Sequence, residues 1–190
     1  MPPSKWKTLS GDRIDNILEY VEQAVRSNGG SKIIHIGTDS LQTGRFTQFV
    51  TVLVLLTVRE DGRGGGGKVA YSRDVVQRIS SLHQRLTQEV WRSLEFSMLL
   101  EGYDLTIHID ANPSERHKSS KYLQELVGMV VGQGFKALWK PDSWAATHCA
   151  DWVVRHKGKL PKLAGLTNET TTPKKTTRDH KKAHGDRAQE

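Results

Sequence analysis

The sequence predicts an α/β domain built on a five-stranded mixed β-sheet with helices on both faces. Three runs rich in β-branched and apolar residues follow one another closely between residues 32 and 72, a pattern typical of an antiparallel meander. From residue 79 onward, helical and strand-like patterns alternate as far as residue 156. The predicted order of elements is therefore one helix, three strands, and then helix, strand, helix, strand and helix.

Residues 1–30 predict an amphipathic helix ahead of the sheet. Asp12 is a residue type that often caps a helix, and the chain after it repeats apolar side chains at helical spacing. These side chains are Ile14, Ile17, Leu18, Val21 and Val25. The segment is therefore expected to be an N-terminal helical extension of the main domain.

Three strands are expected next, over residues 32–37, 46–58 and 68–72. The second is a long β-branched run, which predicts burial on both faces of the sheet. Residues 60–67, including the consecutive glycines 64–67, are expected to form a flexible hairpin connection. The glycine run lacks the lysine and the serine or threonine of a phosphate-binding loop, so it does not indicate nucleotide binding.

Helices and strands alternate through the rest of the domain. Residues 79–101 carry one apolar stripe and predict the first crossing helix, and residues 105–109 predict the fourth strand. Residues 114–132 predict the next helix, 135–139 the fifth strand and 143–156 a closing helix. Short right-handed crossovers would place all five strands in one sheet.

Asp39 and Asp110 follow the first and the fourth predicted strand. In a sheet of this order these strands lie side by side and parallel, so both carboxylates are expected at the same edge. Two carboxylates at one place repel each other unless a proton or a cation relieves the repulsion, and their oxygens suit Mg²⁺ or Mn²⁺ better than zinc. Either aspartate alone is also explained by the frequency of Asp after strands, where it satisfies local backbone groups.

Two further acids come from the predicted helices. Glu89 lies about 70° from the centre of the apolar stripe of its helix, which directs it toward the sheet margin. Asp151 lies on the closing helix, on a side that can face the same sheet edge. Four acids from separated segments are difficult to explain as caps: Asp39, Glu89, Asp110 and Asp151. A site that holds two Mg²⁺ or Mn²⁺ ions for in-line displacement at phosphorus needs a cluster of acids of this kind.

Other polar residues accompany these acids. His148 is a residue type suited to a proton shuttle, although a solvated helix surface explains it as well. Asp142 is expected to cap the closing helix. Phosphate contacts, or simply a solvated face, explain four basic residues: Arg85, Arg116, Lys118 and Lys121. His35 and His108 share strand faces with the two strand-end aspartates and are interpreted as core histidines or as partners of those acids.

The order of elements and the acids in it resemble the ribonuclease H-like superfamily. Five segments within residues 31–156 resemble its YkuK-like branch: Ile-Gly-Thr-Asp-Ser, Ser-Leu-His-Gln-Arg-Leu, His-Ile-Asp-Ala-Asn-Pro, Lys-Ser-Ser-Lys and Lys-Pro-Asp-Ser-Trp-Ala-Ala. The resemblance implies a ribonuclease H-like fold. It also implies that the four acids form the Asp-Glu-Asp-Asp set of that superfamily, which makes them the catalytic and metal-binding residues.

These features predict a divalent-metal-dependent nuclease that hydrolyses phosphodiester bonds in RNA, DNA or a hybrid of the two. The alternative is a non-catalytic module that binds nucleic acid or protein on the same scaffold, because a fold does not determine a function. Binding of Mn²⁺ distinguishes these hypotheses, since a module that only binds nucleic acid or protein has no need of the ion.

Charge and composition set the remaining expectations. The net charge of +7 is concentrated in residues 157–190, which hold nine Lys or Arg against four Asp or Glu. Residues 161–190 predict a disordered basic tail that either attracts phosphate backbones or keeps the protein soluble, after a main domain of residues 31–160. The single cysteine excludes an internal disulfide, and no apolar run approaches the ~18 residues of a membrane span. Because the first residues also lack a secretory signal, we expect a cytoplasmic protein.

Overall fold

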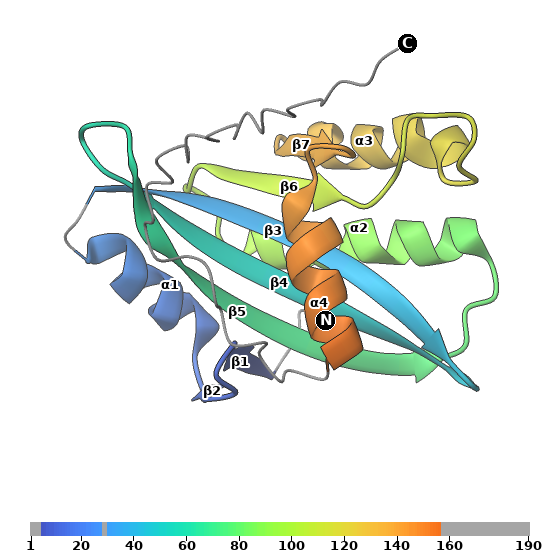
Figure 1. Ribbon diagram of the computed structural model, residues 1–190, viewed down its shortest axis with the longest axis horizontal. Helices are drawn as coiled ribbons and strands as arrows, with labels where there is room; N and C mark the ends of the chain where they lie inside the picture. Colours follow the sequence, from blue (N-terminus) through green and yellow to red (C-terminus); the bar gives the residue numbers. More distant parts are fainter. Residues whose placement is uncertain (1–4, 28–29, 157–190) are drawn as a thin grey trace, which may run out of the picture. The chain divides into compact units, whose positions relative to one another are not determined.

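A long antiparallel meander forms the centre of the sheet in the computed structural model, which describes residues 5–27 and 30–156 (Figure 1). Its strands are β3 (Ser31–Thr43), β4 (Phe46–Val58) and β5 (Gly64–Gln77). The β-branched run of β4 favours this extended conformation, and its residues 49–55 are buried. The meander therefore supplies the rigid centre on which the other elements pack.

Four shorter strands extend the meander into a mixed sheet of the order β2-β1-β5-β4-β3-β6-β7. On one side, β6 (Leu105–Ile109) pairs in parallel with β3, and β7 (Lys136–Trp139) pairs in parallel with β6. On the other side, β1 (Trp6–Thr8) and β2 (Arg13–Ile14) continue the sheet beyond β5 in antiparallel orientation.

The described residues thus form a mixed sheet of seven strands, and the predicted number of five is wrong. The two additional strands have three and two residues, which is too short for a period-two pattern to show in the sequence. They are held by the turn between them, in which the Thr8 N–H donates to the Asp12 carbonyl and the Gly11 N–H to the Thr8 carbonyl.

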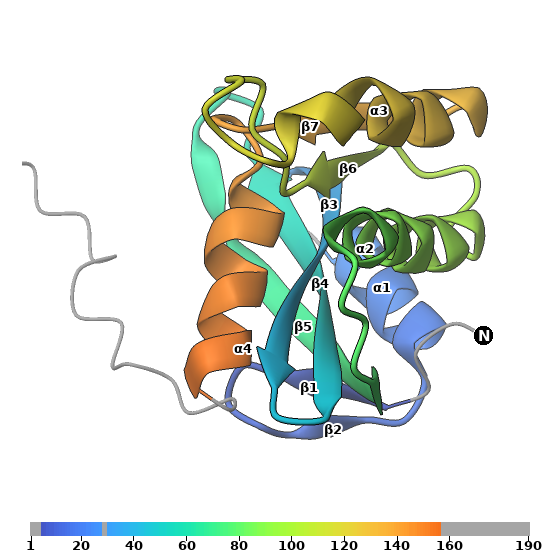
Figure 2. The same ribbon diagram turned by 90° about the vertical axis from the view of Figure 1, so that its right-hand side faces the viewer.

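Helices cover both faces of the sheet, as predicted (Figure 2). One core is formed against α1 (Ile17–Arg26), α2 (Leu82–Met98) and α3 (Leu123–Gly132). A second, smaller core lies on the opposite face, against the π-helical turn η2 (Ala145–Ala150) and α4 (Asp151–His156). The closing helix is therefore alone on its face among the described helices.

Helix α1 begins later than the sequence suggested. Its N-cap is Asn16, whose side-chain oxygen accepts hydrogen bonds from the backbone N–H groups of Leu18 and Glu19. The predicted cap, Asp12, instead accepts hydrogen bonds from the hydroxyl groups of Ser10 and Thr8 in the turn after β1. The prediction failed because both residue types are good caps, and the short strand β2 between them was not recognised.

Three other boundaries differ from the prediction. Strand β3 continues to Thr43 instead of ending at residue 37, so Asp39 lies within the strand and not after it. The glycines 64–67 belong to β5 rather than to a flexible loop, and the turn is limited to residues 59–63. A Cβ atom on Gly65 would lie 2.8 Å from Cγ2 of Thr57, so the close approach of the strands requires glycine there. The helix expected from residue 114 begins only with the 3₁₀ turn η1 (Ser120–Tyr122), because residues 112–119 form side-chain-stabilised turns.

The predicted basic tail, residues 161–190, lies outside the described residues. In the described part of the chain, no helix is both long enough and apolar enough to cross a membrane.

Candidate functional site

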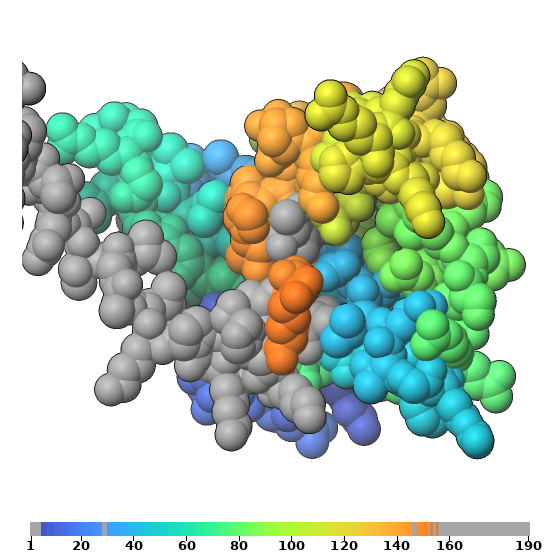
Figure 3. All heavy atoms as spheres, turned by 45° about the vertical axis from the view of Figure 1, so that its right-hand side comes forward, coloured from blue at the N-terminus to red at the C-terminus, as the bar shows by residue number. Residues whose placement is uncertain are grey.

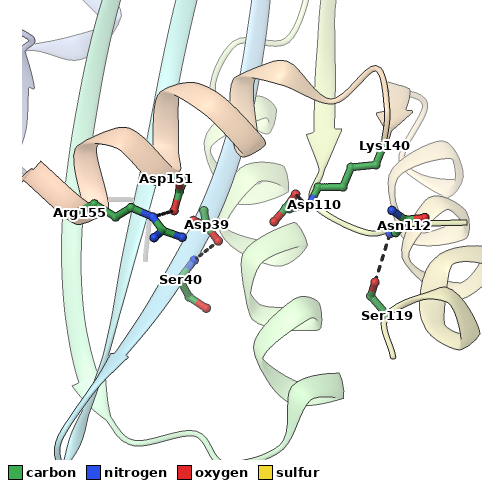
Figure 4. A network of polar contacts seen from close by, with 8 residues as sticks. All are labelled: Asp39, Ser40, Asp110, Asn112, Ser119, Lys140, Asp151 and Arg155. Atoms are coloured by element: carbon green, nitrogen blue, oxygen red, sulfur yellow. Dashed lines mark hydrogen bonds and ion pairs between the residues drawn. The ribbon is translucent and has the colours of Figure 1, made fainter. Parts of the chain in front are cut away.

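Asp39 and Asp110 are brought together by the pairing of β3 with β6. The parallel register sets Gly37 opposite His108, and each aspartate follows two residues later. Figure 4 shows both side chains beside Asp151 of α4, each carried by a different element. The two carboxylates therefore lie near each other at the C-terminal end of β6, although only Asp110 follows a strand end and Asp39 lies within β3.

The environment of Asp39 opposes its negative charge. Burial raises the pKa of this carboxyl group to about 7, and repulsion from Asp110 and Asp151 adds to the shift. The backbone N–H of Ser40, which donates to Oδ1 of Asp39 at 2.7 Å, acts in the opposite direction. Asp39 therefore lies in a place that favours either a proton or a cation.

Glu89 lies underneath this region, on the face of α2 that packs against the sheet. Its side chain is only 5 % exposed, and burial together with repulsion from Asp39 raises its pKa well above the usual value. The hydroxyl group of Ser40 donates a hydrogen bond of 2.6 Å to Oε1 of Glu89. Arg85 in turn donates from Nη1 to the Ser40 oxygen at 3.1 Å, so the sheet edge and α2 are linked by one polar network.

Basic side chains neutralise the two outer acids. Nζ of Lys140 lies 2.8 Å from Oδ1 of Asp110, and Nε of Arg155 lies 2.5 Å from Oδ1 of Asp151 (Figure 4). The first pair is largely buried, whereas Arg155 is two-thirds exposed and its pair contributes little to stability. The site thus combines four carboxylates with cations at its margin.

The donor chemistry of this site fits a hard divalent cation. All four acidic groups offer oxygen ligands, and burial together with neighbouring carboxylates raises the pKa of Asp39 and of Glu89. Within residues 5–27 and 30–156, however, no three acidic, histidine or cysteine side chains are gathered closely enough to hold a metal ion as they stand. Chelation would therefore require side-chain rotation, including release of Asp110 by Lys140.

The other predicted residues separate into two groups. Arg85 contacts the site through Ser40. His148 and Asp142 are exposed, and the backbone of Asp142 forms a turn in which its N–H donates to Trp139 and its carbonyl accepts from Trp144. Among the described residues, no ion pair joins the four acids to the exposed side chains of the 116–121 segment, namely Arg116, Lys118 and Lys121.

Sequence reasoning missed Ser40, Lys140 and Arg155. Lys140 follows Trp139, which pairs with Ile109, so the register of β7 places it next to Asp110. Arg155 lies one helical turn after Asp151, a spacing that the sequence itself shows. The role of Ser40 depends on the distance between β3 and α2, and only the tertiary structure supplies it.

The two histidines of the neighbouring strands belong to the core, as one interpretation held. Nδ1 of His35 lies 2.9 Å from Nε2 of His108, and both rings pack edge-on against Trp144. The backbone N–H of Ala145 donates to Nδ1 of His108 at 3.4 Å. Burial lowers the pKa of His108 to about 4, so the ring is neutral and connects β3 and β6 to the start of η2.

Comparison with known proteins identifies the class to which this fold and site belong. The family model described as "Ribonuclease H-like" matches residues 13–155, which is more than half of the chain. The chain therefore belongs to the ribonuclease H-like family.

Individual relatives agree with this assignment. The chain is 28% identical over 152 residues to the uncharacterized protein YkuK of Bacillus subtilis (strain 168), covering 71% of this chain and 84% of that protein. This similarity confirms the YkuK-like resemblance of the sequence motifs.

Two solved structures are also similar to the chain. Ribonuclease H1 of Halobacterium salinarum NRC-1 is 16% identical, with a TM-score of 0.36, covering 66% of this chain and 98% of that one. The N-terminal ribonuclease H domain of Rv2228c from Mycobacterium tuberculosis, solved as a fusion with maltose-binding protein, is 14% identical, with the same TM-score and coverage of 66% and 96%.

Proposed function

We propose that this protein is a nuclease that hydrolyses phosphodiester bonds with the help of Mg²⁺ or Mn²⁺. The observation that carries the proposal is that acids from four separate segments lie close enough to interact. Besides burial, Asp110 and Asp151 raise the pKa of Asp39, and Asp39 and Asp110 raise the pKa of Glu89. Burying carboxylates close to one another costs free energy, and acids that only cap helices or turns at the surface would not need such an arrangement. Membership of the ribonuclease H-like family supports the same reaction class.

The four acids would divide the work of holding two ions. Asp39, within β3, and Asp110, directly after the neighbouring β6, would hold the ions, and Glu89 and Asp151 would complete the site from the two faces of the sheet. When bound, the ions supply an activated water and compensate the charge that develops at phosphorus. Ser40 fixes the carboxylate of Glu89 through its hydroxyl group and that of Asp39 through its N–H group.

Lys140 and Arg155 have a different part in this proposal. Each now pairs with an outer acid, and each acid would be occupied by a cation in the loaded enzyme. The released ammonium and guanidinium groups would then be free to hold phosphate oxygens at the margin of the site. The basic residues nearest the acids, rather than the exposed residues 116–121, are therefore the principal phosphate ligands in our proposal.

A cleavage assay tests the proposed function. End-labelled single-stranded RNA, single-stranded DNA, duplexes and an RNA–DNA hybrid are incubated with the full chain in Mn²⁺, in Mg²⁺ and in EDTA. We expect metal-dependent cleavage of at least one substrate by the wild type and a loss of at least a hundredfold in Asp110→Asn.

Asp104→Asn is the matched control, because Asp104 precedes β6 as Asp110 follows it and also pairs with a lysine, Lys136, at 2.7 Å. Its cleavage rate should stay within twofold of the wild type. Equal rates for Asp110→Asn and the wild type, or no cleavage of any substrate by the folded wild type, would contradict the proposal.

A further inference from the structure

The hairpin between β3 and β4 carries exposed apolar side chains at its outer end, together with the end of β5. Phe46 is 54 % exposed, Val75 56 % and Leu41 39 %. The register pairs Leu41 with Gln48 and Gln48 with Val75, while Phe46 pairs with Gln77. Cross-strand partners point to the same face, so these three apolar residues share one face of the sheet.

This face is the one that carries Asp39. Side chains alternate along a strand, so Asp39, Leu41 and Thr43 of β3 lie on one side. Asp39 pairs with Val50, which belongs to the core under α4, so that side is the α4 side of the sheet. At about 3.4 Å per residue, Thr43 lies roughly 14 Å beyond Asp39 along β3. The hairpin and α4 are seen on the same face in Figure 3, in cyan and orange.

The same region is positively charged. Residues 40–50 and 75–82 contain no Asp or Glu, and they contain two arginines, Arg45 and Arg78, which are both exposed. Arg78 is held in place because its Nη1 donates to the Gly44 carbonyl at 2.9 Å and its backbone N–H to the Arg45 carbonyl at 2.9 Å. We call the set of Leu41, Arg45, Phe46, Val75 and Arg78 the hairpin surface.

We propose that the hairpin surface binds a single-stranded segment of nucleic acid and leads it toward Asp39, an inference that rests on the proposed nuclease function. Arg45 and Arg78 would contact phosphates, and Phe46, Leu41 and Val75 would contact the faces of unpaired bases. In a duplex the faces of the bases are stacked on one another and cannot contact an apolar protein surface. The bound strand must therefore be unpaired here. The protein is thus a nuclease that prefers single-stranded substrates or single-stranded ends.

A second copy of the chain is a poorer occupant of this surface. A twofold contact over Phe46 would bring Arg45 and Arg78 of both copies near one another, with no acidic residue in the two hairpin segments to compensate their charge. Phosphates supply that compensation directly. Charge complementarity therefore favours a nucleic acid strand, whose unpaired bases also match the apolar side chains.

Fluorescence anisotropy tests the inference with the full chain in EDTA, so that nothing is cut. Labelled 15-nucleotide RNA and DNA single strands are compared with the corresponding duplexes. We expect tighter binding of single strands, a roughly tenfold loss of affinity in Phe46→Ser, and about threefold in Arg45→Gln with a weaker salt dependence. The matched controls are Val131→Ser, which is 56 % exposed on α3, and the exposed Arg59→Gln; both should bind as the wild type does.

The two proposals fail separately in this design. Single-strand binding that depends on Phe46, without any cleavage by the wild type, would support the hairpin surface and refute the nuclease. Metal-dependent cleavage with equal binding by wild type and Phe46→Ser would refute the hairpin surface alone. A dimer in sedimentation that Phe46→Ser dissociates would also overturn it, since the second copy would then be the occupant.

Discussion

Burial and two neighbouring carboxylates oppose the negative charge of Asp39. Its pKa is raised from 3.8 to about 7 in the folded protein, so between these pH values the folded state binds a proton that the unfolded state does not. The stabilising contribution of this group is complete below pH 3.8 and is lost as the pH rises toward 7. At pH 8 the ionised Asp39 therefore destabilises the metal-free protein.

Asp39→Asn removes this penalty. We expect the variant to exceed the wild type in free energy of unfolding at pH 8 in EDTA by roughly 2 kcal/mol, about half of what a three-unit shift gives, because the group is partly exposed. The difference should shrink when the pH is lowered to 5. Urea denaturation at both pH values measures this difference in free energy of unfolding. A variant that is less stable than the wild type at pH 8 would show that ionised Asp39 does not destabilise the folded protein.

Ser40 provides a second test at the level of one residue. Its hydroxyl group lowers the raised pKa of Glu89, so Ser40→Ala should raise that pKa further and move the acidic limb of the pH–rate profile to higher pH. Ser31→Ala is the control on the same strand, because the Ser31 hydroxyl lies 3.5 Å from the Val58 carbonyl and far along β3 from Glu89. An unchanged acidic limb of the pH–rate profile in Ser40→Ala would show that Ser40 does not influence Glu89 in the active protein.

The sequence predicts a site of four acids but not the partners of these acids. The parallel pairing of β3 with β6 brings Asp39 and Asp110 near each other, although Asp39 lies within β3 and not after it. Ser40 was missed because its contacts with Glu89 and Arg85 bridge 49 and 45 positions of the chain. Long-range contacts of this kind depend on how closely a helix packs on a sheet, which no local pattern reports.

Among the elements, α1 shows where local rules were ambiguous. Asn16 accepts two backbone N–H groups, so Asn16→Ala should lower the free energy of unfolding by about 1 kcal/mol. Asp12→Ala should cost less than about 0.5 kcal/mol, because Asp12 stabilises only an exposed turn. Chemical denaturation of the two variants compares them directly, and the reverse order of stability would identify Asp12 as the N-cap of the helix.

The order of the longer strands and helices was predicted correctly, but several of their bounds were not. Strand β4 has its predicted bounds and α2 lies within the predicted range, whereas β3 and β5 extend well beyond theirs. Residues 114–119 were assigned to a helix, although side-chain hydrogen bonds of Asn112 and Ser119 hold this segment in turns. Glycines 64–67 belong to a strand although glycine favours loops, and two of them, Gly65 and Gly67, lie so close to side chains of β4 that a Cβ atom there would be crowded.

At the scale of the whole molecule, the N-terminal strands complete the sheet. Trp6 of β1 is 2 % exposed and packs on Phe96 of α2, with a distance of 4.4 Å between the ring centroids. Trp6→Ala should therefore lower the free energy of unfolding by about 3–5 kcal/mol. Trp91→Ala, at a tryptophan that is 44 % exposed on the same helix α2, should cost less than about 1 kcal/mol. Similar losses in thermal or urea unfolding would mean that β1 is not part of the folded sheet.

The central claim is that four acids from two strands and two helices form one divalent-metal site. The most direct measurement is a calorimetric titration of Mn²⁺ into the wild type, into Asp39→Asn/Asp110→Asn and into the control Asp104→Asn, at pH 8. We predict saturable binding by the wild type and the control, and no binding by the double variant. Equal binding by all three proteins, or none by the folded wild type, would contradict the claim.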